Sequence, residues 1–459
     1  MMMELLIKGA QVVFSDGVTT ADIGVKEGKI AGIYAPGLSP QANRVLDATG
    51  LFIFPGVIDP HMHLGIYNDM ASDFKEDTKA AALGGITTIV NYYRGKESYQ
   101  ESVPKLIEVG DKNSLVDFAF SLGLLTKQHV AEVEGYAREL GITSYKFYRN
   151  YQDDVKKIFG SEDPLTLDSA DMMFILRNFA EISPKLNLCV HCEEMDLQRQ
   201  VAARVKAEES QDSLAYFART SPDYAETISV MGALYLNKIV HGNLYIVHMS
   251  AGSSVDFIAG APELINQGVT VETCPHYLVL TEESPCNLLA KVNPPIHTAQ
   301  DAEKLWEGIR NGLITTLGSD NCPSNLAKKY SKGKDVWGIL PGFPGAGVIL
   351  PVLISEGYHK RGIPLETLAR LSSGNTAKAL NLSQKGVIQV GADADFAIVD
   401  LNWERKVTPE VFGSCDYSVY EGMTFKGWPR FTISRGEVIA ENGKITAESG
   451  RGQYLKRSL

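Results

Sequence analysis

Alternating apolar and polar positions near both ends of the chain predict short β-hairpins. Residues 5–14 and 23–33 alternate in this way, and the turn pairs Asp16-Gly17 and Glu27-Gly28 interrupt them. The same pattern returns at residues 386–400 and 431–440. We therefore expect a small β-sandwich domain built from both chain termini, residues 1–51 and 385–459.

Between these ends, short apolar runs alternate with stretches of helical periodicity, the pattern of parallel βα units in an α/β protein. The eight apolar runs are residues 51–58, 87–92, 116–122, 144–147, 186–190, 244–247, 269–273 and 314–317. Eight parallel strands with crossover helices predict a closed (β/α)8 TIM-like barrel over residues 52–384. The chemistry of such a barrel gathers at the carboxyl ends of its strands.

The composition indicates a globular protein that acts on a small molecule. Of its 459 residues 44% are apolar, and a net charge of −11 with a pI near 5.4 argues against nucleic-acid and anionic membrane surfaces. No apolar run is long enough to span a bilayer, and the start lacks the features of a signal peptide. We expect a cytoplasmic protein. Cys189 and Cys192 match CxxC, but without a second pair a structural role is predicted.

Polar residues that end the predicted strands form a metal-site pattern. His61 and His63 end the first strand and point to the same face of an extended chain. Alone, such a pair suits ordinary hydrogen bonding as well as zinc. The other polar strand ends are Lys146, His191, His248 and Asp320. In a barrel all of these side chains would project into one cavity, which favours metal binding.

Lys146 needs a separate explanation, because an ammonium group would repel metal ions in a weakly screened pocket. A lysine at a barrel mouth is more often solvated or ion-paired. Among histidines and an aspartate, it becomes a suitable ligand if its amine reacts with carbon dioxide to give a carbamate. This modification inverts the charge and supplies two oxygens that can bridge a metal pair.

Three other features each allow two interpretations. Asp320 could cap the following helix, or it could bind a metal and act as the general base. Tyr151 lies five residues beyond Lys146, so its phenol could stabilise an oxyanion or simply pack in an aromatic loop. The glycine-rich run 340–347 has the wrong spacing for a dinucleotide fingerprint and is expected to be a loop that could offer amides to a ligand.

These residues together resemble the cyclic amidohydrolases of the amidohydrolase superfamily, in particular the hydantoinase and dihydropyrimidinase group. The resemblance covers essentially the whole chain. Its motifs are Pro55-Gly-Val-Ile-Asp-Pro-His-Met-His63, Ala80-Ala-Ala-Leu-Gly-Gly-Ile-Thr-Thr88, Ser144-Tyr-Lys146, His191-Cys-Glu193, Ile246-Val-His-Met-Ser250, Glu272-Thr-Cys-Pro-His-Tyr-Leu278, Asn293-Pro-Pro295, Gly318-Ser-Asp320 and Gly391-Ala-Asp-Ala-Asp395.

The resemblance implies a barrel with two divalent metal ions, usually Zn2+. His61, His63 and Asp320 would hold one ion, His191 and His248 the other, and a carbon dioxide-derived carbamate on Lys146 would bridge them. Tyr151 looks like the oxyanion-stabilising tyrosine of this family. Asn293 aligns with a residue whose backbone contacts the cyclic amide. A homotetramer is also implied.

The implied reaction is hydrolysis of the cyclic amide bond of a hydantoin or dihydropyrimidine-type ring, giving an N-carbamoyl amino acid. Allantoinase and dihydroorotase activities are alternatives, although Leu64-Gly65 stands where dihydroorotases typically carry an arginine after the second histidine. Asn321 and Pro341 also depart from the hydantoinase pattern, which bears on the substrate. A non-catalytic dihydropyrimidinase-related scaffold and a mononuclear deaminase are less favoured, because the ligand pattern is complete and includes Lys146.

Overall fold

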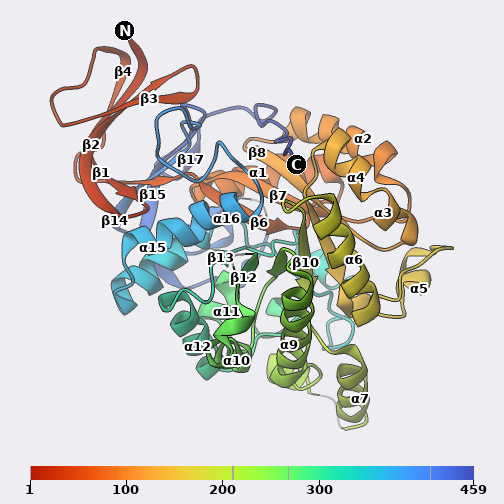
Figure 1. Ribbon diagram of the computed structural model, residues 1–459. Helices are drawn as coiled ribbons and strands as arrows, with labels where there is room; N and C mark the ends of the chain where they lie inside the picture. The colour runs from red at the N-terminus through yellow and green to blue at the C-terminus, as the bar shows by residue number, and fades with distance from the viewer. Residues whose placement is uncertain (1, 209–210, 267, 414) are drawn as a thin grey trace.

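A computed structural model describes residues 2–208, 211–266, 268–413 and 415–459, and these form a barrel and a second sheet (Figure 1). Eight parallel strands run around the barrel in sequence order. They are β6 (Val57–Met62), β7 (Ile86–Tyr93), β8 (Asp117–Gly123), β9 (Ser144–Tyr148), β10 (Asn187–His191), β11 (Leu244–Ile246), β12 (Val269–Thr273) and β13 (Thr316–Leu317). A parallel bridge between Met62 and Asn321 links the first strand to the chain after the last. The predicted (β/α)8 barrel is therefore confirmed.

The first predicted strand, residues 51–58, is in fact two strands. Phe52–Pro55 forms β5, which belongs to the second sheet, and the barrel strand β6 starts at Val57. Gly56 lies between them where a Cβ atom would come within 2.2 Å of the Thr87 hydroxyl oxygen. The unbroken apolar run does not reveal this switch, because both strands are buried.

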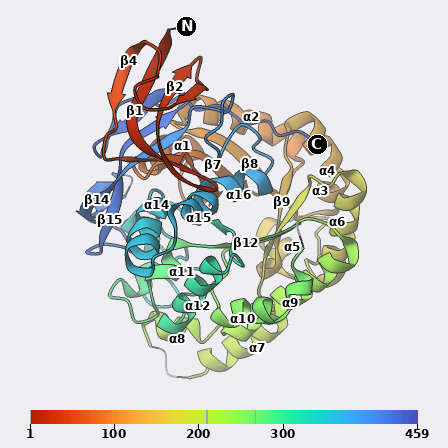
Figure 2. The same cartoon turned by 60° about the vertical axis from the view of Figure 1, so that its left-hand side comes forward.

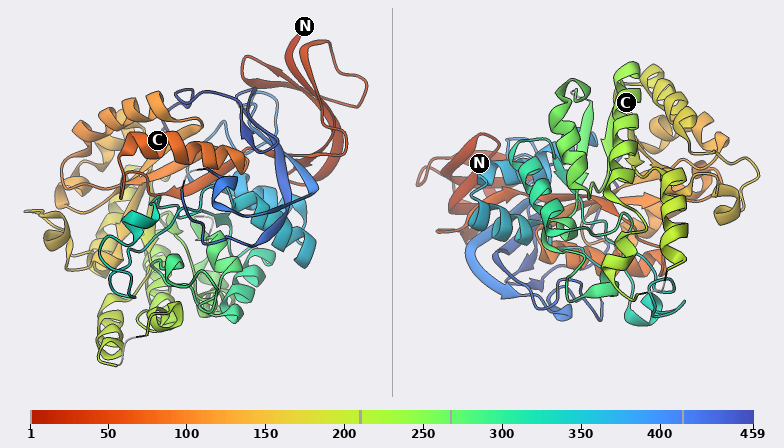
Figure 3. Two further views of the ribbon diagram at one scale, coloured as in Figure 1. Left: turned by 180° about the vertical axis from the view of Figure 1, so that it is seen from behind. Right: turned by 90° about the horizontal axis from the view of Figure 1, so that it is seen from below.

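The second sheet joins the two ends of the chain. Its nine strands are mixed in direction, and β5 links β1 of the first segment to β14 of the last. They are β1 (Met3–Phe14), β2 (Gly17–Lys26), β3 (Lys29–Tyr34), β4 (Ala42–Asp47), β5, β14 (Phe396–Lys406), β15 (Thr424–Ser434), β16 (Glu437–Glu441) and β17 (Lys444–Ile445). Figure 3 shows these terminal segments lying together to one side of the barrel. The prediction of a small β domain from both termini is confirmed.

Helices cover the outside of the barrel (Figure 2). They are α1 (Met70–Leu83), α2 (Tyr99–Asn113), α3 (Lys127–Ala131), α4 (Val133–Gly135), α5 (Val155–Phe159), α6 (Ser169–Ile182), α7 (Met195–Lys206), α8 (Leu214–Ala218), α9 (Asp223–Val240), α10 (Gly252–Gly260), α11 (Pro275–Val279), α12 (Ala299–Arg310), α13 (Leu326–Lys329), α14 (Ile349–Val352), α15 (Leu365–Ala369) and α16 (Asn375–Ala379). The start of α12 is fixed by a capping box between Thr298 and Asp301. None of the helices in the described part of the chain combines the length and the hydropathy that a membrane span requires.

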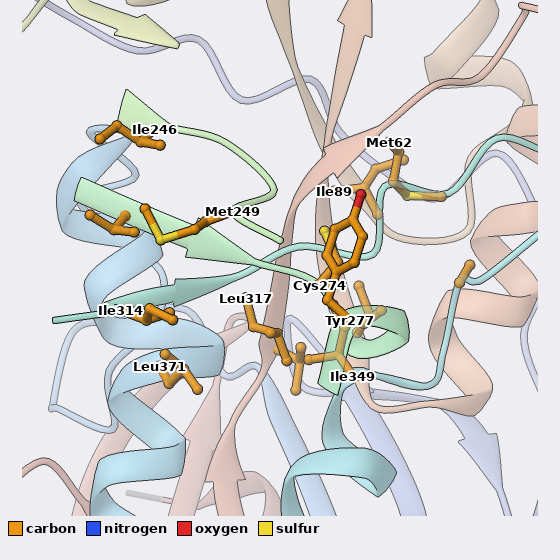
Figure 4. Packing of buried hydrophobic residues seen from close by; sticks show 14 of the residues in the cluster. Met62, Ile89, Ile246, Met249, Cys274, Tyr277, Ile314, Leu317, Ile349 and Leu371 are labelled. Carbon is orange, nitrogen blue, oxygen red and sulfur yellow. The ribbon is translucent and has the colours of Figure 1, made fainter. Parts of the chain in front are cut away.

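The largest apolar cluster fills the space between the barrel strands and their helices. Figure 4 shows part of it, with Met249, Cys274 and Leu317 at the ends of neighbouring strands and Leu371 on a covering helical segment. The second sheet has a separate cluster, which includes Ile23. The site at the strand ends thus rests on a tightly packed base.

A buried ionic cluster joins the barrel to the second sheet. The Lys385 ammonium lies 2.6 Å from Asp117, 2.9 Å from Asp393 and 2.7 Å from Asp395. These three carboxylates could otherwise attract a metal ion. Because the lysine already occupies their centre, we interpret the cluster as structural.

Candidate metal centre

The structure brings the predicted metal ligands together at the carboxyl end of the barrel. A cavity of about 120 Å³ opens there. The predicted residues that line it are His63, Lys146, Tyr151, His191, His248, Asn293 and Asp320. His61 is fully buried and contacts the ring of His63, with 5.0 Å between ring centroids. All eight residues singled out from the sequence therefore meet at one site.

His61, His63 and Asp320 form one half of the site. The Asp320 Oδ1 atom lies 3.1 Å from the Nε2 atom of His63 and 3.4 Å from the Nε2 atom of His61. The ligand atoms of the three residues all lie within 4.8 Å of one another. Burial lowers the pKa of His61 well below its usual value, so its imidazole is neutral at pH 7.

The tautomer of His61 makes this half of the site suitable for a cation. Its Nδ1 atom lies 2.7 Å from a carboxylate oxygen of Glu272, to which it donates its proton. The lone pair on Nε2 then faces Asp320, and Nε2 has no hydrogen-bond partner among the described residues. Two acceptors that face each other in a dry pocket repel, and a metal ion between them removes the repulsion.

His191 and His248 form the other half. The Nδ1 atom of His191 lies 2.9 Å from the Nε2 atom of His248, and the two rings are 4.6 Å apart between centroids. The Nε2 atom of His191 contacts the Glu193 carboxylate, which makes Nδ1, on the side of His248, the nitrogen that carries a lone pair and could bind a metal. Burial lowers the pKa of His248 well below its usual value, so it is also neutral.

Lys146 lines the same cavity as both halves of the site, without a hydrogen-bond partner among the described residues. Its side chain is 1% exposed, and the Nζ atom makes no hydrogen bond to any described residue. The ring of Tyr92 lies beside it, with 4.9 Å between the ring centroid and Nζ. Burial lowers the pKa of Lys146 to about 8. A buried, unpaired and readily neutralised amine fits a group that is chemically modified in the working protein.

Sequence reasoning missed the carboxylates that orient these histidines. Glu272 accepts the hydrogen bond from His61, and it also accepts hydrogen bonds from the His248 amide at 3.0 Å and from the Tyr245 hydroxyl at 2.8 Å. Glu193 plays the corresponding part beside His191. Both glutamates stand inside the quoted motifs, so a search for acidic residues beside each histidine could have found them. Such partners fix the tautomer of a metal-binding imidazole.

Tyr151 and Asn293 lie in the wall of the cavity. Tyr151 ends a short 3-10 helix, η2 (Arg149–Tyr151), and its ring stacks on Tyr148 with 5.2 Å between centroids. Its phenol can therefore face a ligand, while its ring also packs in an aromatic loop. Both interpretations made from the sequence are compatible with this placement.

The two departures from the hydantoinase pattern have structural roles in the loop at residues 340–347. The Asn321 side chain accepts hydrogen bonds from the amides of Gly345 and Ala346 at 2.7 and 3.2 Å, and donates to Asp77. It therefore anchors the loop. The carbonyl of Pro341 accepts a hydrogen bond from Tyr67 at 2.8 Å, which fixes the loop against the opposite wall of the cavity.

Comparison with known proteins agrees with this architecture. Residues 52–439 match the amidohydrolase family. The L-hydantoinase of Paenarthrobacter aurescens is 32% identical over 99% of this chain and 98% of that protein, and the allantoinase of Deinococcus radiodurans is 32% identical over 100% of both. The crystal structure of dihydropyrimidinase from Brevibacillus agri NCHU1002 has a TM-score of 0.90 at 30% identity and covers 99% of each chain. Matches of this length and identity show that the chain belongs to the amidohydrolase family.

Proposed function

We propose that this protein hydrolyses the cyclic amide bond of a hydantoin or dihydropyrimidine-type ring and releases an N-carbamoyl amino acid. The observation that carries the proposal is the meeting of six candidate metal ligands, four histidines, a lysine and an aspartate, at the carboxyl end of one barrel. Related proteins over the full chain include hydantoinases, and a solved neighbour is a dihydropyrimidinase. The family and the site geometry both support this reaction class.

In this proposal His61, His63 and Asp320 hold one Zn2+ ion, and His191 and His248 hold a second. Lys146, as a carbamate, would supply oxygen ligands to both ions. Two divalent ions would polarise the ring carbonyl and lower the pKa of water from about 15.7 to about 7. The free lone pairs on the histidines and the absence of a partner for Lys146 among the described residues support this ligand set.

The carbamate would form from the neutral amine of Lys146. Its nitrogen attacks carbon dioxide, an N–C bond forms, and one proton leaves to solvent. The lowered pKa, about 8, keeps part of the amine population uncharged near neutral pH. The product is an anion, which replaces repulsion of the metal ions by attraction.

Asp320 is placed to move the protons of the reaction. Burial raises the pKa of its carboxyl group, but the neighbouring imidazoles, through the hydrogen-bonding contact with His63, lower it more, so the group starts ionised. It can accept the proton of the attacking water and return it to the departing ring nitrogen. The Tyr151 hydroxyl would donate a hydrogen bond to the oxygen that gains charge, and the Asn293 backbone would orient the ring.

Allantoinase activity is the main alternative, since an allantoinase matches at the same identity as the hydantoinases. A ring-opening assay across hydantoins, dihydrouracil, allantoin and dihydroorotate, with the zinc, manganese and cobalt forms, tests the proposal. We expect a hydantoin or dihydropyrimidine to be opened fastest. A protein that opens none of these rings and binds no metal after reconstitution would instead be a scaffold.

We also propose a cytoplasmic homotetramer. Helix α9 supports self-association, because it presents a stripe of exposed apolar side chains, namely Tyr224, Ile228, Met231, Tyr235 and Ile239. Light scattering coupled to size exclusion measures the mass directly. A monomeric mass at micromolar concentration would refute the assembly.

A further inference from the structure

Arg94 brings a positive charge into the wall of the same cavity. It directly follows β7 at the carboxyl end of the barrel and lines the cavity together with Lys146. Its guanidinium carbon lies 5.4 Å from the ring centroid of Tyr148 and 5.7 Å from that of Tyr151. An arginine stays protonated at any pH at which a protein is folded, so this charge is permanent.

No carboxylate in the described part of the chain pairs with Arg94. Asp320 is the one acidic side chain that lines the cavity, and it faces the two histidines of its own half of the site. A buried arginine nearby, Arg149, is paired with Glu194 at 2.6 Å. A half-buried cation without a counter-ion is costly, and functional sites keep such charges for a ligand of opposite sign.

Two polar side chains in the wall of the same cavity also have unused hydrogen-bonding groups. The Tyr148 side chain is 3% exposed and lines the cavity, and the Arg94 guanidinium can donate to its hydroxyl oxygen, yet the O–H itself has no acceptor among the described residues. Asn150 lines the same cavity, and its buried side-chain oxygen is likewise unpaired. Because the two ends of an amide are interchangeable in orientation, Asn150 can also present its N–H group. Buried polar groups without partners at a cavity wall indicate a ligand that supplies them.

We infer that Arg94, Tyr148 and Asn150 form a subsite for a carboxylate carried by the substrate ring. The inference rests on the proposed function and narrows it to cyclic ureides with an anionic substituent. The ring amide would face the histidines and Asp320, while the carboxylate accepts two parallel hydrogen bonds from the planar guanidinium and one from the Tyr148 hydroxyl. Arg94 would then recognise the anion in place of the arginine that dihydroorotases typically carry after the second histidine, a position at which this sequence has no arginine.

A purely structural role for Arg94 makes a different prediction. If the guanidinium only holds the ring of Tyr151 in place, its removal should slow all substrates equally. If it binds a carboxylate, its removal should slow carboxylated substrates selectively. The test therefore needs a pair of substrates that differ only in charge.

Hydantoin-5-acetate and its carboxamide form such a pair on a five-membered ring, and dihydroorotate and its carboxamide form one on a six-membered ring. We expect the native protein to prefer the carboxylate in at least one pair by 10-fold or more in kcat/KM. Arg94→Gln should reduce that preference by about 10- to 100-fold, the usual effect of losing a charged hydrogen-bonding partner. Arg94→Lys should retain part of it.

Lys96→Gln is the matched control, because it removes a positive charge from an exposed side chain two residues away that lies 3.9 Å from Glu97. It should leave the preference unchanged. Equal losses for both members of a pair in Arg94→Gln, or no preference in the native protein, would overturn the inference.

Calorimetric binding of each carboxylate and carboxamide to the purified protein provides a second measurement. If the carboxylate binds more tightly than the carboxamide and this difference depends on Arg94, the subsite is supported. This holds even if the protein opens neither ring, because the failure to open a ring would refute only the proposed function. Equal binding of both forms would refute the subsite.

Discussion

Glu272 is predicted to control metal affinity through the tautomer of His61. Its side chain is fully buried, and one oxygen receives the His61 Nδ1 proton at 2.7 Å and the His248 amide at 3.0 Å. The other oxygen accepts from Tyr245 at 2.8 Å. A Glu272→Gln substitution can preserve this geometry, because the amide oxygen can face the first two donors and the amide nitrogen can face the tyrosine oxygen.

The expected loss follows from the change of charge at a pH above the Glu272 pKa, which burial raises to about 7. Hydrogen bonds to a charged group contribute about 1.5–3 kcal/mol, whereas neutral ones contribute about 0.5–1.5 kcal/mol. Weakening the bond to His61 by this difference also makes its Nε2 atom less basic. We expect a loss of about 10- to 100-fold in metal affinity, or about 1.4–2.7 kcal/mol.

Zinc titration against a competing chelator, with metal content measured by mass spectrometry, tests this prediction. Glu226→Gln is the control, because Glu226 is a buried carboxylate that accepts hydrogen bonds from Ser250, Ala251 and Ser254 and forms none with a histidine of the described residues. It should lower the free energy of unfolding by about 1–3 kcal/mol and leave zinc affinity unchanged. Native zinc affinity in folded Glu272→Gln would refute the role of Glu272.

Three further predictions concern the proton carrier, the bridging lysine and the ionic cluster. Asp320→Asn should lower kcat by about 10²- to 10⁴-fold in a stopped assay, with an unchanged circular dichroism spectrum; near-native turnover would remove Asp320 from the mechanism. When the native protein is loaded with metal in the absence of carbon dioxide, its activity should be low, and added bicarbonate should restore it. The activity of Lys146→Ala should not change with bicarbonate. A rise in the activity of this variant would argue against a carbamate on Lys146. Lys385→Met should lower the free energy of unfolding by about 3–5 kcal/mol in urea, because Asp395 loses its ionic partner and Asp117 and Asp393 keep only Arg435 and Lys29. Burial raises the pKa of Asp393, but Lys385 and Lys29 together lower it more, so the folded pKa is below the unfolded value of about 3.9. The contribution of Asp393 to the free energy of unfolding is full above about pH 5 and is lost as the pH falls through the folded pKa. The free energy of unfolding of Lys385→Met should therefore fall less over this range than that of the native protein. The same pH dependence in both proteins would contradict the pairing of Lys385 with Asp393.

The local sequence pattern was sufficient to predict the barrel and the residues at its strand ends. Apolar runs of strand length alternate with helical stretches, and residues that end parallel strands must meet at one end of a barrel. Positions such as His191 and Asp320 follow from that rule without any knowledge of neighbours. The split at Gly56 did not follow, because an apolar run reports burial and not which sheet buries it.

Only the tertiary structure decided which side chains touch. Glu272 meets His61 although 211 positions separate them, because closure of the barrel brings their strands to the same end. The isolation of Arg94 from any carboxylate in the described residues, and the anchoring of the glycine-rich loop by Asn321, depend in the same way on loops distant in sequence. The periodicity of apolar residues shows which side of a single helix or strand is buried. Hydrogen bonds and unpaired charges depend instead on pairs of segments that the fold brings together.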